Sequence, residues 1–235
     1  GYLSGLKEEE RLSNGGAETN SKKEPEFLKE GLVAYYPFNG NAKDESGNGH
    51  DGEVNGATLT TDRNGNSDSA YDFDGDSSIE VAESALNTGF DYSDPLTVSA
   101  WVELDEARWK HKVYSNALDF NITLVDGYLR AEIFEGNSNS YKMERTTIQI
   151  TAGVWYHLAA VWDGIDWKIY VNATLGASDT ADSETSMGSS EYPSLIGRSA
   201  AYNEPLDGRI DDIRIYKRSL SAEEVKALYE FEKAK

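Results

Sequence analysis

The stretch LDGRIDDIRIYKRSLSAEEVKALY, residues 206–229, contains a strand followed by a helix and decides the class of fold. The isoleucine-rich run 210–216 is typical of a β-strand. Ser221 and Glu224 have the spacing of a capping box, which begins a helix by satisfying backbone N–H groups at its first turn. The helix would dock on a sheet through a face formed by Val225, Leu228 and Tyr229.

Upstream of this stretch, short apolar runs are separated by Gly, Asn and Asp. The clearest predicted strands lie at 32–36, 96–102, 155–162 and 168–171, and the second of these alternates apolar and polar residues. Asp163-Gly164 between the last two is a strong hairpin signal, and the turn could extend to Asp166. Many strands and a single helix predict an all-β domain over residues 32–235.

The first 31 residues have a different composition, rich in Glu, Lys, Ser and Asn with scattered Leu. Such a segment has too little apolar surface to offset the entropy of ordering its chain. We expect residues 1–31 to form a flexible polar linker that precedes the domain. Leucine contacts between this segment and the domain are the alternative.

The chain has a net charge of −20, from 42 acidic and 22 basic side chains. That surface repels nucleic-acid phosphates and anionic membranes, so the sequence predicts neither partner. It attracts divalent cations, although solubility alone would also explain it. The absence of cysteine excludes disulfides and thiol catalysis. No apolar stretch approaches the roughly 20 residues of a membrane-spanning helix.

Six segments, read in order, resemble the laminin-G-like branch of the concanavalin A-like lectin and glucanase superfamily. They are GLVAYYPFNGNAKDESGNGHDGEVNGATLTTDRNGN (31–66), AYDFDG (70–75), LTVSAWV (96–102), WYHLAAVWDG (155–164), PSLIGRS (193–199) and the stretch quoted first. Asn172-Ala173 departs from the family, whose members usually carry Asp-Gly there. The resemblance implies a two-sheet antiparallel jelly-roll sandwich with a short C-terminal helix. It also implies an extracellular or cell-surface domain within a larger multidomain chain.

Glucanases of this superfamily carry a Glu-x-Asp-x-Glu motif on one strand, and this chain has an incomplete version of it. The nearest string is Glu103-Leu104-Asp105-Glu106-Ala107, with alanine where the third carboxylate should stand. Glycoside hydrolysis needs two carboxylates across the scissile bond. His157, inside an apolar run, is interpreted as a structural histidine rather than a base. We therefore expect a non-catalytic protein.

Resemblance to the glucanase branch also implies a structural calcium ion. An Asp in the last strand binds it there, and Asp211 stands at the matching position, with Asp44 and the carbonyl of Gly75 as companions. Calcium prefers such oxygen ligands. The alternative is that Asp211 caps turn amides without a metal. The run 62–68 has oxygen-bearing residues at alternate positions, but a plain Asn/Gly turn is favoured there.

Aromatic residues in polar loops are the candidates for ligand binding, because sugars stack on exposed aromatic faces. Trp109 lies in the polar stretch EARWKHK, and Tyr141 and Tyr202 lie in other predicted loops. Packing onto the sandwich edge is the alternative for each. We expect a binding or adhesion module whose partner is a glycan or a protein surface. A ligand-free structural spacer and a divergent glycoside hydrolase are the competing functions.

Overall fold

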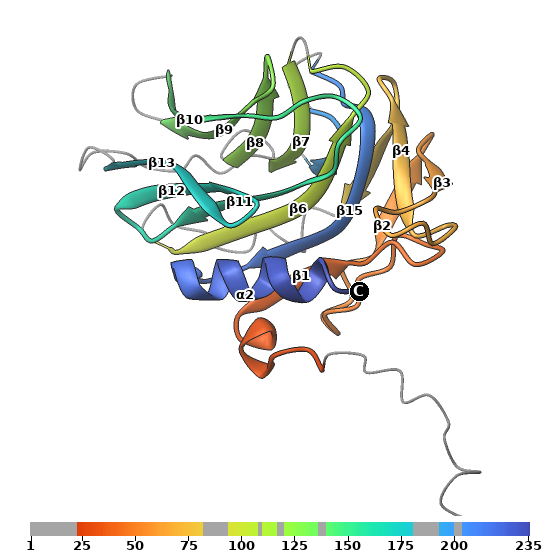
Figure 1. Ribbon diagram of the computed structural model, residues 1–235, viewed down its shortest axis with the longest axis horizontal. Coiled ribbons are helices and arrows are strands. Elements are labelled where there is room, and N and C mark those ends of the chain that lie inside the picture. The colour runs from red at the N-terminus through yellow and green to blue at the C-terminus, as the bar shows by residue number, and fades with distance from the viewer. Residues whose placement is uncertain are drawn as a thin grey trace, which may run out of the picture.

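The computed structural model describes residues 23–81, 94–107, 110–116, 120–135, 140–180, 193–199 and 204–235. Two antiparallel sheets lie one above the other, with a helix below the lower sheet (Figure 1). The jelly-roll sandwich predicted from the sequence is therefore confirmed.

The larger sheet has eight strands in the order β13-β12-β11-β6-β15-β4-β3, with β1 also paired to β15. Its strands are β1 (Leu32–Tyr36), β3 (Thr58–Thr60), β4 (Ala70–Asp74), β6 (Leu96–Leu104), β11 (Tyr156–Trp162), β12 (Asp166–Val171), β13 (Thr174–Thr180) and β15 (Asp207–Tyr216). The other sheet has seven strands in the order β10-β9-β8-β7-β14-β5-β2. These are β2 (Gly52–Asn55), β5 (Ser78–Val81), β7 (Lys110–Asn116), β8 (Phe120–Val125), β9 (Tyr128–Glu135), β10 (Ser140–Gln149) and β14 (Ser194–Ile196).

The main core lies between the two sheets and follows from the alternation of side chains along each strand. In β6, Val98, Ala100 and Val102 face inward, each with at most 1% of its surface exposed. Phe120 of β8 faces them from the other sheet and stacks on Trp167 with ring centroids 5.3 Å apart. Burying each such large apolar side chain contributes about 1.5–3 kcal/mol.

A second apolar cluster covers the outer face of the eight-stranded sheet. Helix α2 (Ala222–Glu232) lies across this face (Figure 1) and buries Val225 and Leu228 against strand residues that include Val161 of β11. Both bonds of the predicted capping box are present at its start, between Ser221 and Glu224. In the part of the chain that the structure describes, no helix has the length and apolarity needed to cross a membrane.

The N-terminal boundary of the domain lies earlier than predicted. A short 3-10 helix, η1 (Glu26–Lys29), places Leu28 in the cluster under α2 with none of its surface exposed. Glu24 forms an ion pair of 2.7 Å with buried Arg214, and the Arg218 guanidinium donates to the carbonyl of Phe27. Residues 24–31 are thus packed against the sandwich and are not part of a linker; residues 1–22 lie outside the described residues.

Two tight turns join β11, β12 and β13. Asp163 accepts the backbone N–H of Asp166 at 2.8 Å, so the first turn does extend to that residue. Asn172 and Ala173 form the second turn, with φ angles of 49° and 60°. Left-handed backbone at both central positions matches the twist of a hairpin and favours Asn and Gly. Ala173 therefore holds a conformation that its Cβ disfavours.

Strand β15 is irregular at its centre, and this irregularity positions the site described below. Its first half pairs with β4 and its second half with β1, while β6 runs along its other edge. A bulge opposite β6 falls between Asp211 and Arg214, and Asp212 has a φ of 47°. The extra residue turns two successive acidic side chains toward the space where β1 and β4 diverge.

Candidate functional site

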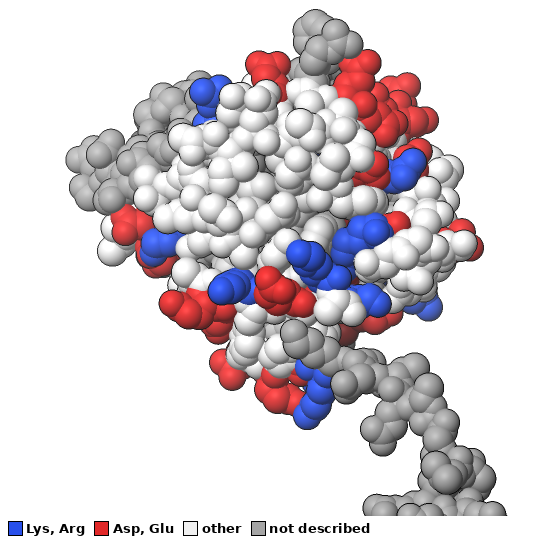
Figure 2. Space-filling model, in the orientation of Figure 1, with Lys and Arg blue, Asp and Glu red and all other residues white. Residues whose placement is uncertain are grey.

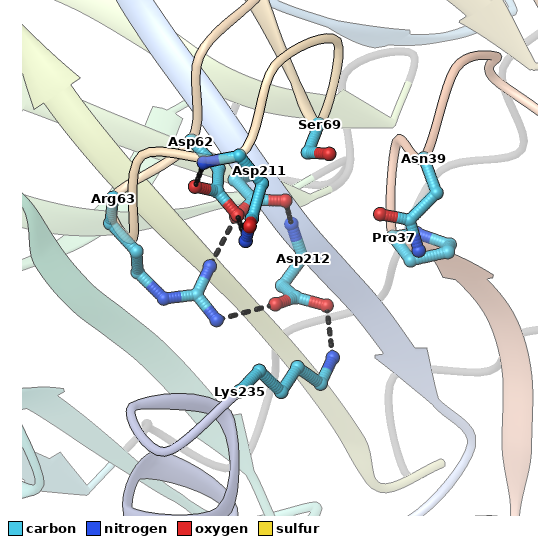
Figure 3. A pocket seen from close by; sticks show the side chains of 9 residues that line it. Pro37, Asn39, Asp62, Arg63, Ser69, Asp211, Asp212 and Lys235 are labelled. Atoms are coloured by element: carbon cyan, nitrogen blue, oxygen red, sulfur yellow. Dashed lines mark hydrogen bonds and ion pairs between the residues drawn. The ribbon is translucent and has the colours of Figure 1, made fainter. Parts of the chain in front are cut away.

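A polar pocket of about 160 Å³ opens at this bulge (Figure 3). Four segments of the chain meet there: the turn after β1, the loop between β3 and β4, the bulge of β15 and Lys235, three positions after the end of α2. Its lining residues are Pro37, Asn39, Asp62, Arg63, Asn66, Ser69, Asp211, Asp212 and Lys235.

Arg63 joins the two acidic residues at the floor of the pocket. One of its terminal nitrogens is bonded to Asp211, and the other lies 2.6 Å from an oxygen of Asp212 (Figure 3). The Lys235 ammonium lies 2.6 Å from the second oxygen of Asp212, which also accepts the hydroxyl of Tyr35 at 2.6 Å. Arg63, Asp211 and Asp212 expose at most 5% of their side chains, so these are buried ion pairs.

Behind the floor, Glu232 of α2 ties the helix to the same charged group. Its carboxylate accepts the indole N–H of Trp101 at 3.0 Å and Nε of Arg214 at 2.8 Å. Its backbone carbonyl accepts a bond of 2.6 Å from Arg63, whose guanidinium lies 4.5 Å from the centre of the Trp101 ring. Acidic and basic side chains therefore alternate along the path from the pocket to the side of α2 that faces the sheet.

His157 lies in this region as a buried, neutral ring. It stands 5.5 Å from the Trp101 ring, and its nitrogens form no hydrogen bond with the described residues. Burial and then the nearby Arg63 lower its pKa to about 3. The structural interpretation of His157 is consistent with this position, but packing rather than hydrogen bonding holds the ring.

The pocket has more negative charge than its cations fully balance. Burial, and then the neighbouring Asp212, raise the pKa of Asp211 to about 8. Burial opposes the ionisation of Asp212 as well, but Lys235 and Arg63 lower its pKa. Burial and Asp212 raise the pKa of Glu232 to about 7. Of the two, Asp212 therefore ionises at the lower pH.

The predicted calcium ligands are not brought together. Asp44 organises its own loop, where it accepts the backbone N–H groups of Tyr35 at 2.9 Å and of Ser46 at 2.8 Å. Gly75 follows β4 at the end that pairs with Asp207, and Asp211 lies beyond the opposite end of that pairing. Within the described ranges, no three His, Asp or Glu side chains are grouped so that they could hold a metal ion. Sequence spacing missed the pairing of Asp211 because its partner is an arginine 148 residues earlier.

A larger pocket of about 510 Å³ lies at the end of the sandwich where β4 and β7 meet the segment before β15. It is lined by Asp74, Gly75, Lys110, His111, Glu204, Pro205 and Asp207. The Lys110 ammonium lies 2.6 Å from Oε1 of Glu204, and the buried Lys112 lies 3.0 Å from Oε2. Glu204 itself was not among the residues predicted to bind a ligand, although Tyr202, two positions earlier, was.

Of the three aromatic residues predicted to bind a ligand, the structure describes the backbone of one. Trp109 and Tyr202 lie outside the described residues, next to Lys110 and two positions before Glu204 in the sequence. Tyr141 was expected in a loop, but it belongs to strand β10, where its backbone pairs with Phe134 of β9.

Glu103, the first residue of the incomplete glucanase motif, lies on the helix-bearing side of the larger sheet. Glu103 faces away from the core and forms an ion pair of 3.3 Å with Arg209. Leu104 is fully buried in the core, and Asp105 lies beyond the last residue of β6. The Glu103 carboxylate is therefore paired with an arginine of the neighbouring strand β15.

Comparison with known proteins identifies the fold family. A laminin-G family model, described as the concanavalin A-like lectin/glucanases superfamily, matches residues 73–226. The structure is similar to the binding domain of Paraclostridial Mosquitocidal Protein 1, with a TM-score of 0.72 and 21% identity over 86% of this chain and 52% of that one. It is also similar to domain 4 of AbnA, a GH43 extracellular arabinanase from Geobacillus stearothermophilus, with a TM-score of 0.66 and 24% identity over 84% and 98% of the two chains.

A botulinum neurotoxin type C structure matches with a TM-score of 0.66 and 12% identity over 87% of this chain and 52% of that one. The chain thus spans about half the length of these toxin structures and nearly all of the arabinanase domain. No curated protein sequence matches it. By its sequence match and its two-sheet architecture, the chain belongs to the concanavalin A-like lectin/glucanases superfamily.

Proposed function

We propose that this chain is a non-catalytic, extracellular binding module of a larger protein, with a glycan or a protein surface as its partner. The observation that carries the proposal is the pocket of about 510 Å³ at the end of the sandwich. It combines an ordered charged pair, Lys110 and Glu204, with the apolar ring of Pro205. Ligand sites typically join apolar walls with a few fixed polar groups in this way.

Two structural relatives support a glycan partner. Domain 4 of the extracellular arabinanase was solved in complex with arabinotriose. Cell entry of botulinum neurotoxin type C depends on interaction with two ganglioside molecules. We propose Trp109, Tyr141 and Tyr202 as stacking residues, and the position of two of them beside Lys110 and Glu204 in the sequence supports this assignment.

A glycan array, run in calcium and in EDTA, tests the proposal. Trp109→Ala and Tyr202→Ala should weaken binding about two- to tenfold each, since one stacked ring contributes roughly 0.5–1.5 kcal/mol. Tyr229→Ala is a matched control, because its ring stacks on Trp101 under α2. An array and a panel of extracellular proteins without any specific ligand would favour the structural spacer. Reducing sugar released from laminarin, and abolished by Glu103→Gln, would instead show a hydrolase.

Calcium is the second part of the proposal, placed at the polar pocket rather than at the predicted set. The pocket wall supplies the hard oxygens that calcium prefers, from the carboxylates of Asp211 and Asp62 and from Asn39 and Ser69. Because few carboxylates are available, amide, hydroxyl and backbone oxygens would complete such a site. A calcium ion at Asp211 would have to displace the Arg63 guanidinium from that carboxylate.

Thermal unfolding in calcium and in EDTA tests this part. A ligand that binds only the folded form stabilises it by about 2.7 kcal/mol at a hundredfold excess over Kd. Calcium should therefore raise the melting temperature by about 5–10 °C, and Asp211→Asn should reduce that increase. Magnesium should substitute poorly because it loses its water shell reluctantly. Identical melting in millimolar calcium and in EDTA would remove the calcium site and leave the glycan proposal intact.

A further inference from the structure

Glu204 stands out in the larger pocket because two lysines each pair with one of its carboxylate oxygens. Lys110 approaches Oε1 from the pocket, and 42% of its side chain is exposed. Lys112 pairs with Oε2, and only 2% of its side chain is exposed. Burial opposes ionisation of Glu204, but both lysines lower its pKa. The carboxylate is therefore charged and fixed in orientation.

The buried lysine is itself anchored by the seven-stranded sheet. Lys112 of β7 lies 2.9 Å from the hydroxyl of Thr123 in β8 and 3.2 Å from the carboxylate of Glu132 in β9. Thr123 and Glu132 have at most 4% of their surfaces exposed. This row across three adjacent strands makes Glu204 a preorganised hydrogen-bond acceptor, which reduces the entropy lost when a ligand binds.

We propose that the Lys110–Glu204 pair binds two neighbouring hydroxyl groups of a neutral sugar. A carboxylate accepts and an ammonium donates, while each sugar hydroxyl can do both, so a diol can bridge the pair at once. Pro205 lies beside them and offers an apolar surface for the ring carbons of the sugar. Hydrogen bonds to charged groups are stronger than those between neutral groups. This inference rests on the proposed function and names the class of glycan.

The charges around the pocket select against acidic sugars. Among the described residues that line it, Asp74 and Asp207 stand with Glu204, and Lys110 is an exposed cation. Acidic side chains also gather at several edges of the face seen in Figure 2, and the chain carries a net charge of −20. A uronate or sulfate group would therefore be repelled at the pocket and during approach.

Glycan binding by the full chain tests the inference with two variants and two controls. The array carries neutral oligosaccharides, among them arabinotriose and cellotetraose, and acidic ones such as trigalacturonate. Glu204→Gln and Lys110→Met remove one partner each and should weaken neutral-sugar binding tenfold or more. Their matched controls are Glu230→Gln and Lys226→Met, on exposed positions of α2, which should bind within about twofold of the wild type.

Each outcome of this experiment either supports the inference or overturns it. Tight binding of neutral sugars that both pocket variants weaken supports the inference. Neutral-sugar binding that neither variant changes, or tighter binding of trigalacturonate, overturns it while the proposed function stands. If no oligosaccharide binds the wild type, the glycan function fails and the inference fails with it. Glu204→Gln could unfold the domain because Lys112 would lose an ion-pair partner. In that case the Lys110→Met variant, at an exposed position, tests the inference alone.

Discussion

Removal of the N-terminal segment tests the boundary that the structure places near residue 23. A chain of residues 32–235 lacks Leu28, which has no exposed surface, and Glu24, which pairs with buried Arg214. Losing a fully buried leucine costs about 3–5 kcal/mol. The lost ion pair adds about 1 kcal/mol or less, because Arg214 keeps its bond to Glu232. In a domain of this size, about 4 kcal/mol lowers the melting temperature by roughly 8–16 °C.

Calorimetry and urea titration of three chains would measure this effect: residues 1–235, 23–235 and 32–235. The first two should melt within a few degrees of each other, and the third should melt well below them. Leu28→Ala in the longest chain should reproduce most of the loss, whereas Lys29→Ala, at an exposed position of the same 3-10 helix, should not. Melting of chain 32–235 within about 2 °C of chain 23–235 would refute the reasoning, and the segment would then be a linker after all.

Three further predictions concern buried charge and backbone strain. Arg63→Met leaves two buried carboxylates without their shared cation and should cost about 3–5 kcal/mol in urea unfolding; a cost near zero would show that the ion pairs do not stabilise the fold. The pKa values of Asp211 and Glu232 are raised to about 8 and 7, so their contribution to stability is full below pH 4 and disappears as pH rises through 7 to 8. The melting temperature should fall between pH 5 and 8.5, and Asp211→Asn should flatten that curve; an unchanged slope in the variant would contradict the assignment. Ala173→Gly relieves a left-handed backbone and should stabilise the domain by about 0.5–1 kcal/mol, whereas a lower melting temperature would mean that the turn is unstrained.

The sequence predicted most of the fold because strand identity depends on neighbouring residues. The runs at 32–36, 96–102 and 210–216 became β1, β6 and β15, and the capping box of α2 formed as expected. Leu28 was assigned to a linker because a single leucine in a polar segment has no periodic pattern. Its side chain is buried by the outer face of the eight-stranded sheet, whose strands lie far from it in the sequence.

The site was less predictable because its partners come from separate parts of the chain. Asp211 was predicted as a calcium ligand, whereas in the structure it pairs with Arg63, a residue that had no signal beyond its place in a turn. Glu204 was not predicted for the same reason, since its fixed orientation depends on the ion pair with Lys112 in β7. Long-range pairing of charges is a property of the topology, and local spacing carries no information on it.

The position of β15 also determines the order in which the domain can fold. The last strand of the chain lies inside the sheet, between β6 on one edge and β1 and β4 on the other. Leu32 therefore has no strand partner until Tyr216 has been synthesised. Such distant contacts are slow to form, because a long loop must close before they stabilise the chain. During synthesis, β1, β4 and β6 each keep an unpaired edge, so a chain that stops before β15 should associate with other chains instead of folding.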